Sequence, residues 1–353
     1  MLRLFEVKDV DHRFYQERLK GFLPDRMMDI HTHVWLKSFR RAAPTGRAVT
    51  WPLCVAEQGP IEELIETYRL LFPGKSVKPL IFSFVESHED DFEAANAYVS
   101  RAASEHGFAA LVFASPQWSA QRLEQEIRSG GFIGAKVYLT LSPGHIPVDE
   151  IRIFDFLPHH QLEVLDRHGW IVMLHIPRPG RLRDSVNLAD MLEIERRYPN
   201  ARIIIAHVGR AYCPEDVGDA FTVLAQTRRM LFDISANTNA AVFEQLIRTV
   251  GPRRILFGSD LPITRMRMRR ICENGNYINL VPRGLYGDVS DDKHMREVDG
   301  EQADVLSFFL YEEIDAFRRA AQATVLTPRD IEDVFSGNAA RVIQSASGRT
   351  AGT

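Results

Sequence analysis

Two histidines that lie two residues apart are the first feature of the chain suited to chemistry. The stretch "MMDIHTHVWL" (27–36) places His31 and His33 at the end of a short apolar run. Residues i and i+2 of a strand point to the same face, so both imidazoles project to one side. Neutral imidazole is a common metal ligand. The pair alone does not establish a metal site, because the chain holds 12 histidines and a polar strand end reads the same way.

Four more ionisable side chains lie in or directly after other apolar runs. They are Lys136 in "FIGAKVYL" (132–139), His175 in "WIVMLHI" (170–176), His207 in "ARIIIAHV" (201–208) and Asp260 in "RILFGSD" (254–260). If these runs are parallel strands of one barrel, the residues meet at the same end of it. Four histidines and one aspartate that end four separate strands are hard to attribute to chance. We therefore predict a metal site, while Lys136 taken alone is equally consistent with a solvated or ion-paired lysine.

The elements that carry these residues follow a regular alternation. Eight apolar runs, rich in Ile, Val, Leu and Phe, have the composition of strands buried on both faces; besides the five above they are "PLIFSFV" (79–85), "FAALVFA" (108–114) and "MLFDISA" (230–236). Segments with helical spacing separate them, at 61–72, 90–106, 119–130, 155–169, 187–200, 214–230 and 239–251, with two more near 302–322 and 328–344. The alternation predicts an α/β fold, a (β/α)₈ TIM barrel; a doubly wound open sheet shares much of it.

Three regions fall outside this alternation. They are residues 1–26 before the first strand, 37–60 after it and 261–300 after the eighth strand. Long loops inside a compact domain are usually functional or disordered, and the two βα loops belong to the mouth where barrels build their sites. We predict one barrel domain over residues 22–346, with an N-terminal extension (1–21) and a C-terminal tail (347–353).

Composition narrows the class of partner. The hydrophobic and charged fractions, 45% and 25%, are those of ordinary globular proteins. A net charge of −4 gives no reason to expect nucleic acid or an anionic membrane as a partner, so we expect a small-molecule substrate and leave a homodimer open. The chain shows neither a signal peptide nor a membrane-spanning run, which favours the cytoplasm. Cys54, Cys213 and Cys272 lack C-x-x-C spacing and predict neither a disulfide framework nor a cysteine zinc site.

The motifs resemble those of the amidohydrolase superfamily, in the branch called amidohydrolase-related family 2. The resemblance covers about residues 22–345 and rests on "DIHTHVW", "GFIGAKVYL", "MLHI", "IIIAHVG", "ILFGSDLP" and "DIEDVFSGNAARVI". It implies a divalent metal, most often zinc, with an open position for water; the implied ligands are His31, His33, His175 and Asp260. It also implies that His207 acts as an electrophile or acid/base, and that Asp260 takes a proton from the water.

The resemblance leaves two roles for Lys136. In binuclear relatives a lysine at this place carries a carbamate that bridges two metals, and the histidines equivalent to His175 and His207 hold the second ion. In the mononuclear members that dominate the branch, the lysine contacts substrate instead. We favour one metal and a substrate-binding Lys136.

Two chemistries are compatible with this site. The complete set of groups favours a hydrolase that opens an amide, ester or lactone bond of a small, carboxylate-bearing molecule. The alternative is non-oxidative decarboxylation of an aromatic or unsaturated acid, and a non-catalytic metal-binding barrel is the third hypothesis. Arginine suits carboxylates: we predict Arg178 and Arg210 as anion binders, and interpret "RMRMRR" (265–270) either as a carboxylate site or as a solvated or interface cluster.

Overall fold

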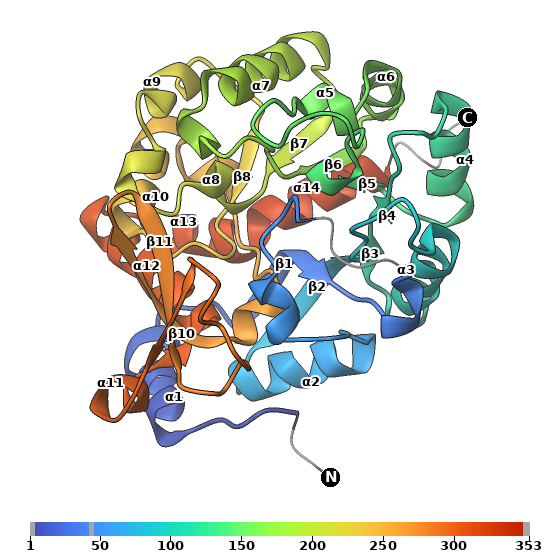
Figure 1. Cartoon of the computed structure of the whole chain (residues 1–353). Helices are drawn as coiled ribbons and strands as arrows, with labels where there is room; N and C mark the ends of the chain where they lie inside the picture. Colours follow the sequence, from blue (N-terminus) through green and yellow to red (C-terminus); the bar gives the residue numbers. More distant parts are fainter. Residues whose placement is uncertain (1–3, 42–45, 349–353) are drawn as a thin grey trace.

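In the computed structural model, which describes residues 4–41 and 46–348, short parallel strands form a ring surrounded by helices (Figure 1). Each apolar run predicted as a strand overlaps a strand of the structure, and the run 108–114 holds two short ones. The strands are β1 (Arg26–His33), β2 (Ser76–Phe82), β3 and β4 (Ala109–Ala110, Val112–Phe113), β5 (Gly134–Val137), β6 (Ile171–Leu174), β7 (Arg202–Ile205), β8 (Leu231–Asp233) and β9 (Ile255–Leu256).

Backbone hydrogen bonds join these strands into a closed barrel. The order is β1-β2-β3 in one sheet and β4 to β9 in a second. Leu111 lies between β3 and β4 and donates to the Ile81 carbonyl at 3.0 Å, so residues 109–113 act as one strand shared by both sheets. Three bonds connect β1 to the last strand and its continuation: Ile30 N to Phe257 O (3.0 Å), Asp260 N to His31 O (2.8 Å) and His33 N to Leu261 O (2.8 Å). The predicted TIM barrel is confirmed.

Alternation along the strands divides the core into two layers. On β6, Ile171 and Met173 pack inside the barrel, and Val172 packs outward with the helix layer. All three are fully buried. Because both faces of the strands are covered, the runs are continuously apolar rather than alternating, as expected of a parallel sheet between two apolar layers.

Long helices cover the barrel, and most predicted helices are confirmed. They are α2 (Ile61–Leu71), α3 (Phe92–His106), α4 (Ala120–Ser129), α6 (His159–His168), α7 (Ser185–Arg197), α10 (Ala240–Val250), α12 (Phe309–Ala323) and α14 (Asn338–Ser347). Side-chain caps at Asp91, Ser119, Asp184 and Asn239 satisfy first-turn N–H groups. None of the described helices combines the length and apolar character that crossing a bilayer requires.

Shorter helices occupy the connections. They are α1 (Asp9–Phe14), α5 (Ile153–Phe156), α8 (His207–Arg210), α9 (Ala220–Leu224), α11 (Glu301–Asp304) and α13 (Pro328–Glu332). The helix predicted over 214–230 is mostly wrong, because only α9 and a single 3₁₀ turn at Pro214–Asp216 form there. Gly218, with φ +52°, lies between these two elements in a conformation that a helix does not contain.

The region predicted as a long loop after the eighth strand is instead a small sheet. The hairpin of β10 (Arg267–Glu273) and β11 (Asn276–Pro282) pairs with β12 (Met295–Val298) and β13 (Ser307–Phe308), in the order β12-β11-β10-β13. Asn274 and Gly275 connect β10 to β11 with φ +51° and +73°. An Asn-Gly pair with both φ values positive is the preferred two-residue hairpin turn. This signal stands in the sequence, and the prediction of an unstructured loop overlooked it.

The N-terminal segment packs as part of the same body. Tyr15, Leu19 and Leu23 are buried in the main core. Asp11 is fully buried and accepts two hydrogen bonds from Arg267 of β10, at 2.9 and 2.6 Å. The segment therefore anchors the inserted sheet to the barrel. The predicted C-terminal tail lies mostly outside the described residues.

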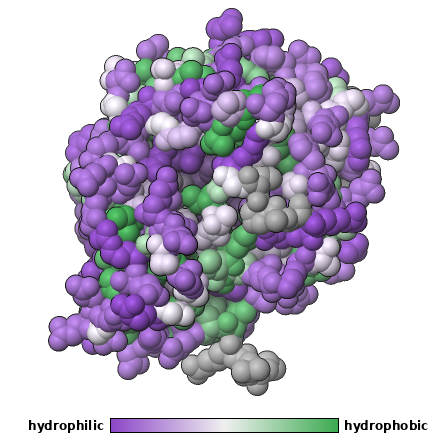
Figure 2. Space-filling model, in the orientation of Figure 1, coloured by the Kyte–Doolittle hydropathy of each residue, from purple (hydrophilic) through white to green (hydrophobic). Residues whose placement is uncertain are grey.

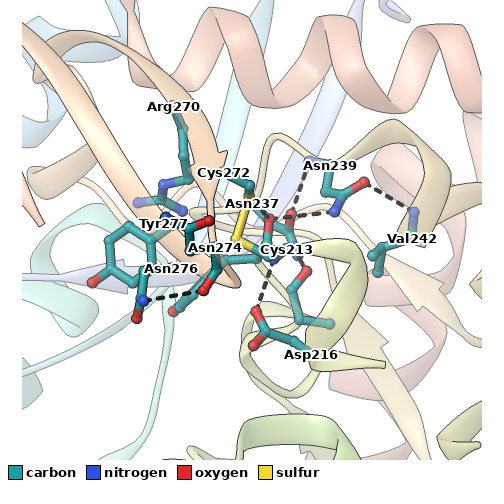
Figure 3. Close-up of a disulfide and its surroundings, with 12 residues drawn as sticks. Cys213, Asp216, Asn237, Asn239, Val242, Arg270, Cys272, Asn274, Asn276 and Tyr277 are labelled. Atoms are coloured by element: carbon teal, nitrogen blue, oxygen red, sulfur yellow. Dashed lines mark hydrogen bonds between the residues drawn. A yellow bond between two sulfur atoms is a disulfide. The ribbon is translucent and has the colours of Figure 1, made fainter. Parts of the chain in front are cut away.

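A disulfide crosses from the inserted sheet to the barrel loops (Figure 3). Cys213 and Cys272 are 59 residues apart in sequence, and their Cα atoms lie 5.8 Å apart. The prediction that the cysteines form no disulfide is wrong, because the fold of the hairpin, rather than local spacing, brings the two thiols together. Cys54 is free and exposed.

Candidate metal centre

One pocket at the barrel mouth collects the six ionisable residues predicted at the strand ends. It encloses about 540 Å³, its open mouth included, and is lined by His31, His33, Lys136, His175, His207 and Asp260. The rest of its wall is Val49, Pro52, Leu53, Phe84, Glu86, Phe113, Tyr138 and Ile263. Figure 2 shows a hollow near the centre of the face that it draws. The structure thus brings together residues that are up to 229 positions apart, from His31 to Asp260.

Strand periodicity explains why these side chains point inward. Met173 faces the barrel interior, and His175 follows it by two residues. Leu256 likewise faces the interior. Gly258 and Asp260 follow it at intervals of two residues and therefore lie on the same side. Gly258 permits this arrangement, because a Cβ on it would lie 2.7 Å from the Cβ of His31. A side chain at position 258 would therefore separate Asp260 from the histidines of β1.

Hydrogen bonds to acceptors fix the tautomers of three histidines. Nδ1 of His31 lies 2.8 Å from the carboxylate of Asp233. Nδ1 of His33 lies 3.2 Å from the Ser83 carbonyl, and Nδ1 of His207 lies 3.0 Å from the Ser235 carbonyl; these three contacts require an N–H on each Nδ1, since a carbonyl or carboxylate only accepts. In the neutral ring the lone pair is then on Nε2. This is the arrangement in which carboxylates and carbonyls orient metal-binding imidazoles.

The free nitrogens converge on Asp260. Its Oδ1 lies 3.3 Å from Nε2 of His33 and 3.6 Å from Nε2 of His31. Ligand atoms of His31, His207 and Asp260 all lie within 4.8 Å of one another. Nε2 of His31 is buried without a hydrogen-bond partner, as is Nδ1 of His175. Buried polar atoms are rarely left unpaired, and a cation between these lone pairs would supply the missing partner, so the donor set fits a divalent metal.

Burial sets the protonation states of the centre. It lowers the pKa of all four histidines, so they stand neutral with a lone pair available. Burial alone would raise the pKa of Asp260, but the imidazoles that face it, His33 first, lower it to about 2. The centre therefore combines neutral imidazoles with a carboxylate that is ionised at neutral pH, a donor set that zinc and similar ions prefer.

Lys136 is buried at the mouth without an anionic partner. No carboxylate of the described chain lies within ion-pair distance of its ammonium group, which sits 5.1 Å from the ring centre of Phe82 and 5.9 Å from that of Tyr138. Burial lowers its pKa to about 8, opposed by the charges of Asp260 and Asp233. A lysine that remains mostly protonated at neutral pH, and that the protein does not neutralise, is suited to bind an anion.

The two predicted anion-binding arginines lie outside this pocket. Arg178 pairs with Asp184 at 3.1 Å and is absent from the pocket lining. Arg210 lines a larger neighbouring cavity that shares Val49 with the pocket, and donates to the Pro177 carbonyl at 2.9 Å. Arg210 is thus near the mouth, whereas Arg178 has a structural partner.

The arginine run on and before β10 is held by structural contacts. Three of its members pair with acids: Arg265 with Glu63 (3.1 Å), Arg267 with Asp11 (2.6 Å) and Arg269 with Glu312 (3.5 Å). Arg270 donates to the carbonyl of Ala236 at 2.7 Å and packs on aromatic rings. None of the four lines the metal pocket.

Sequence reasoning missed the residues that orient the histidines. Asp233 accepts from Nδ1 of His31 and, at 2.8 Å, from the backbone N–H of His207. The hydroxyl of Ser235 donates to Asp233 at 2.5 Å. Both lie in the predicted strand "MLFDISA", where an aspartate and a serine interrupt an otherwise apolar run; that interruption was the available signal. Glu86 and Tyr138 of the pocket wall were missed as well, although Glu86 directly follows the predicted strand 79–85 and Tyr138 lies two residues after Lys136.

Comparisons with known proteins agree with this architecture. The amidohydrolase family model matches residues 28–344. An amidohydrolase from Burkholderia multivorans, solved with bound zinc, is 13% identical, with 90% of this chain and 99% of that one covered and a TM-score of 0.58. A dihydroxybenzoic acid decarboxylase from Polaromonas sp. JS666, with bound manganese and the inhibitor 2-nitroresorcinol, is 13% identical, with 91% and 97% covered and a TM-score of 0.54.

A third similar structure is 4-oxalomesaconate hydratase from Rhodopseudomonas palustris, 16% identical, with 90% and 96% covered and a TM-score of 0.54. No curated protein sequence matches the chain significantly. At these identities the structures establish the fold alone, and their activities differ among themselves. The family model spans most of the chain: this barrel belongs to the amidohydrolase family.

Proposed function

We propose that the protein is a metal-dependent hydrolase that opens an amide, ester or lactone bond of a small, carboxylate-bearing molecule. The observation that carries the proposal is the convergence of acceptors in the pocket. Nε2 of His33 and of His31 face Asp260 at 3.3 and 3.6 Å, with their protons held on Nδ1. A cation between these facing lone pairs would satisfy them, which supports the proposal.

The residues that would hold one divalent metal are His31, His33, His175 and Asp260. Imidazoles and a carboxylate are ligands that catalytic zinc uses, with a position left open for water. Zinc is our first choice; similar structures were solved with zinc or manganese. When bound, such an ion acts as a Lewis acid that lowers the pKa of water and polarises a carbonyl.

Proton transfer and substrate binding would fall to three side chains of the pocket. Asp260 is ionised and accepts the proton of the attacking water, then returns it to the leaving group. His207 presents the lone pair of Nε2 to the same space, where it accepts a hydrogen bond or a proton from the water or the substrate and then returns the proton. Lys136 binds the substrate carboxylate from the pocket wall. Because Lys136 contacts aromatic rings and retains its charge, we assign it to substrate and keep one metal, rather than a carbamate-bridged pair with His207.

Arg210 remains a candidate anion binder at the entrance. It lines the cavity that adjoins the metal pocket, and no carboxylate of the described chain pairs with it there. A substrate whose second anionic group extends out of the pocket would meet this guanidinium. Arg178 is not carried into the proposal, since Asp184 already neutralises it.

Decarboxylation of an aromatic acid is the second candidate. The observation in its favour is the pocket wall, where Phe84, Phe113 and Leu53 offer apolar side chains against which a ring can pack. The same metal site would orient the acid, and Lys136 would contact its carboxylate.

The test is a substrate panel with product analysis on protein of measured metal content. Zinc- and manganese-loaded protein is assayed against lactones, esters and amides of small acids, and against aromatic acids with coupled detection of carbon dioxide. Turnover in which the products retain every carbon supports the hydrolase, and released carbon dioxide supports the decarboxylase. Stoichiometric metal without turnover of any member would contradict both and favour a non-catalytic barrel.

A further inference from the structure

The turn after β8 holds His207 in place. The backbone carbonyl of Ser235 accepts from Nδ1 of His207 at 3.0 Å, and the Ser235 hydroxyl oxygen lies 2.9 Å from the same nitrogen. Because that hydroxyl donates its own proton to Asp233, it accepts from Nδ1. The orientation and tautomer of His207 therefore depend on where this turn places the carbonyl and the hydroxyl of Ser235.

Ala236, the residue after Ser235 in this turn, is held through both of its backbone polar groups. Ala236 has φ +50°, a conformation that an alanine rarely adopts. Its N–H donates to the buried Glu313 carboxyl at 2.7 Å, and its carbonyl accepts from Arg270 at 2.7 Å. The conformation persists because both polar groups of Ala236 are bound by residues from outside the barrel strands. Removing either contact frees the turn to relax toward ordinary backbone angles.

Arg270 comes from β10 of the inserted hairpin. Its guanidinium also donates to Asn279 at 2.9 Å and packs 4.5 Å from the ring centres of Tyr277 and Phe309. Among the described residues no carboxylate pairs with it, in contrast to its neighbours Arg267 and Arg269. The hairpin therefore determines where this guanidinium points. Among the described residues, its hydrogen bond to the turns of the barrel strands goes to the Ala236 carbonyl.

The disulfide ties the same hairpin to the chain that follows His207. Cys272 lies two residues after Arg270, and Cys213 lies six residues after His207 (Figure 3). Arg270 is also 4.7 Å from the ring centre of Tyr212, the residue before Cys213. The hairpin is thus attached to both segments that position His207: the turn after β8 through Arg270, and the loop after β7 through the disulfide.

We propose that Arg270 is a positioning residue: by binding the Ala236 carbonyl, it holds the turn that orients His207. The Cys213–Cys272 disulfide keeps Arg270 within reach of that carbonyl. A dithiol that reduces the disulfide, with cleavage of the S–S bond, formation of two thiols and oxidation of the dithiol to its own disulfide, weakens this attachment. The catalytic consequence rests on the role proposed above for His207, whereas the effect on its tautomer does not.

The experiment compares Arg270→Gln with Arg269→Gln, a neighbour on the same strand that faces Glu312. Side-chain ¹⁵N NMR of histidine-labelled protein, with the His207 signals assigned from a His207→Gln sample, reports its tautomer. We expect the Nδ1–H form in wild type and Arg269→Gln, and a mixture of tautomers in Arg270→Gln. On a substrate found by the panel, kcat falls about 10- to 100-fold in Arg270→Gln, the cost of a small misplacement, while KM and metal content are unchanged.

Three further samples keep the test decisive if Arg270→Gln does not fold. Arg270→Lys retains a donor for the Ala236 carbonyl and restores part of the Nδ1–H population. Wild type reduced with dithiothreitol, and Cys272→Ser, shift the tautomer in the same direction as Arg270→Gln. A folded Arg270→Gln or Cys272→Ser protein with the wild-type tautomer overturns the proposal, even if no substrate is found. Equal losses of kcat in Arg270→Gln and Arg269→Gln overturn it as well.

Discussion

The histidines at the barrel mouth and the arginines before and along β10 are both dense groups of polar side chains, and they differ in whether the protein satisfies them. Each arginine has a partner within the chain: Arg265, Arg267 and Arg269 pair with acids, and Arg270 donates to a backbone carbonyl. At the mouth, by contrast, Nε2 of His31 is unpartnered. Buried polar atoms without a partner in a pocket indicate that a ligand binds there. Charged side chains that pair with other groups of the chain indicate a structural role instead.

The largest expected effect is on activity, and it concerns the unpartnered groups of the metal pocket. Asp260→Asn keeps the shape of the side chain but removes the charge and the base. We expect activity to fall by about 10²- to 10⁴-fold, the range of a lost general base, together with weaker metal binding. Activity assays and metal analysis of the folded variant check this. Full activity with full metal content would contradict the role of Asp260.

Removing a satisfied arginine should instead cost stability. Arg267→Ala leaves the fully buried Asp11 carboxylate unpaired, which costs about 3–5 kcal/mol of unfolding free energy. Metal content and the kcat of the remaining folded protein stay unchanged, because Arg267 does not line the pocket. Chemical denaturation followed by circular dichroism measures the loss. If stability stays at the wild-type level, Arg267 is not the anchor that we describe.

The residue that orients two histidines should have an intermediate effect. Asp233→Asn replaces the carboxylate that accepts from Nδ1 of His31 and from the backbone of His207. Loss of such an orienting acceptor typically weakens metal affinity or activity by about 10- to 100-fold. Titration with zinc in a competing chelator measures the affinity. An affinity equal to that of wild type would show that the tautomer of His31 does not depend on Asp233.

The smallest effect concerns the pH dependence of substrate binding. Lys136 has a pKa lowered to about 8 by burial, so it is mostly charged at pH 7 and becomes neutral as the pH rises through 8. A bound carboxylate favours the charged form, and we therefore expect KM for the substrate to increase above about pH 8 with little change below pH 7. In Lys136→Met, KM is high at all pH values. A KM that is independent of pH between 7 and 9 would exclude this role.

The sequence was sufficient to predict the barrel and the six ionisable residues of the pocket, because both follow from strand periodicity. The positions of His175 and Asp260 follow from counting in twos from the buried Met173 and Leu256. It did not identify Asp233 and Ser235 as orienting residues, since their hydrogen bonds depend on how the closed barrel places the end of β8 beside His31 of β1 and His207 after β7. The inserted sheet was predictable in part: Asn274-Gly275 is a hairpin turn, but the pairing of Cys213 with Cys272 requires the three-dimensional position of that hairpin.

The most direct test of the account is the metal stoichiometry of wild type, His31→Ala and Arg269→Gln, measured by inductively coupled plasma mass spectrometry after loading with zinc and gel filtration. We predict one zinc per chain in wild type and in Arg269→Gln, and loss of the metal in folded His31→Ala. Metal that is absent from wild type, or retained in full by His31→Ala, would contradict the claim that the unpartnered nitrogens at the mouth form a metal centre.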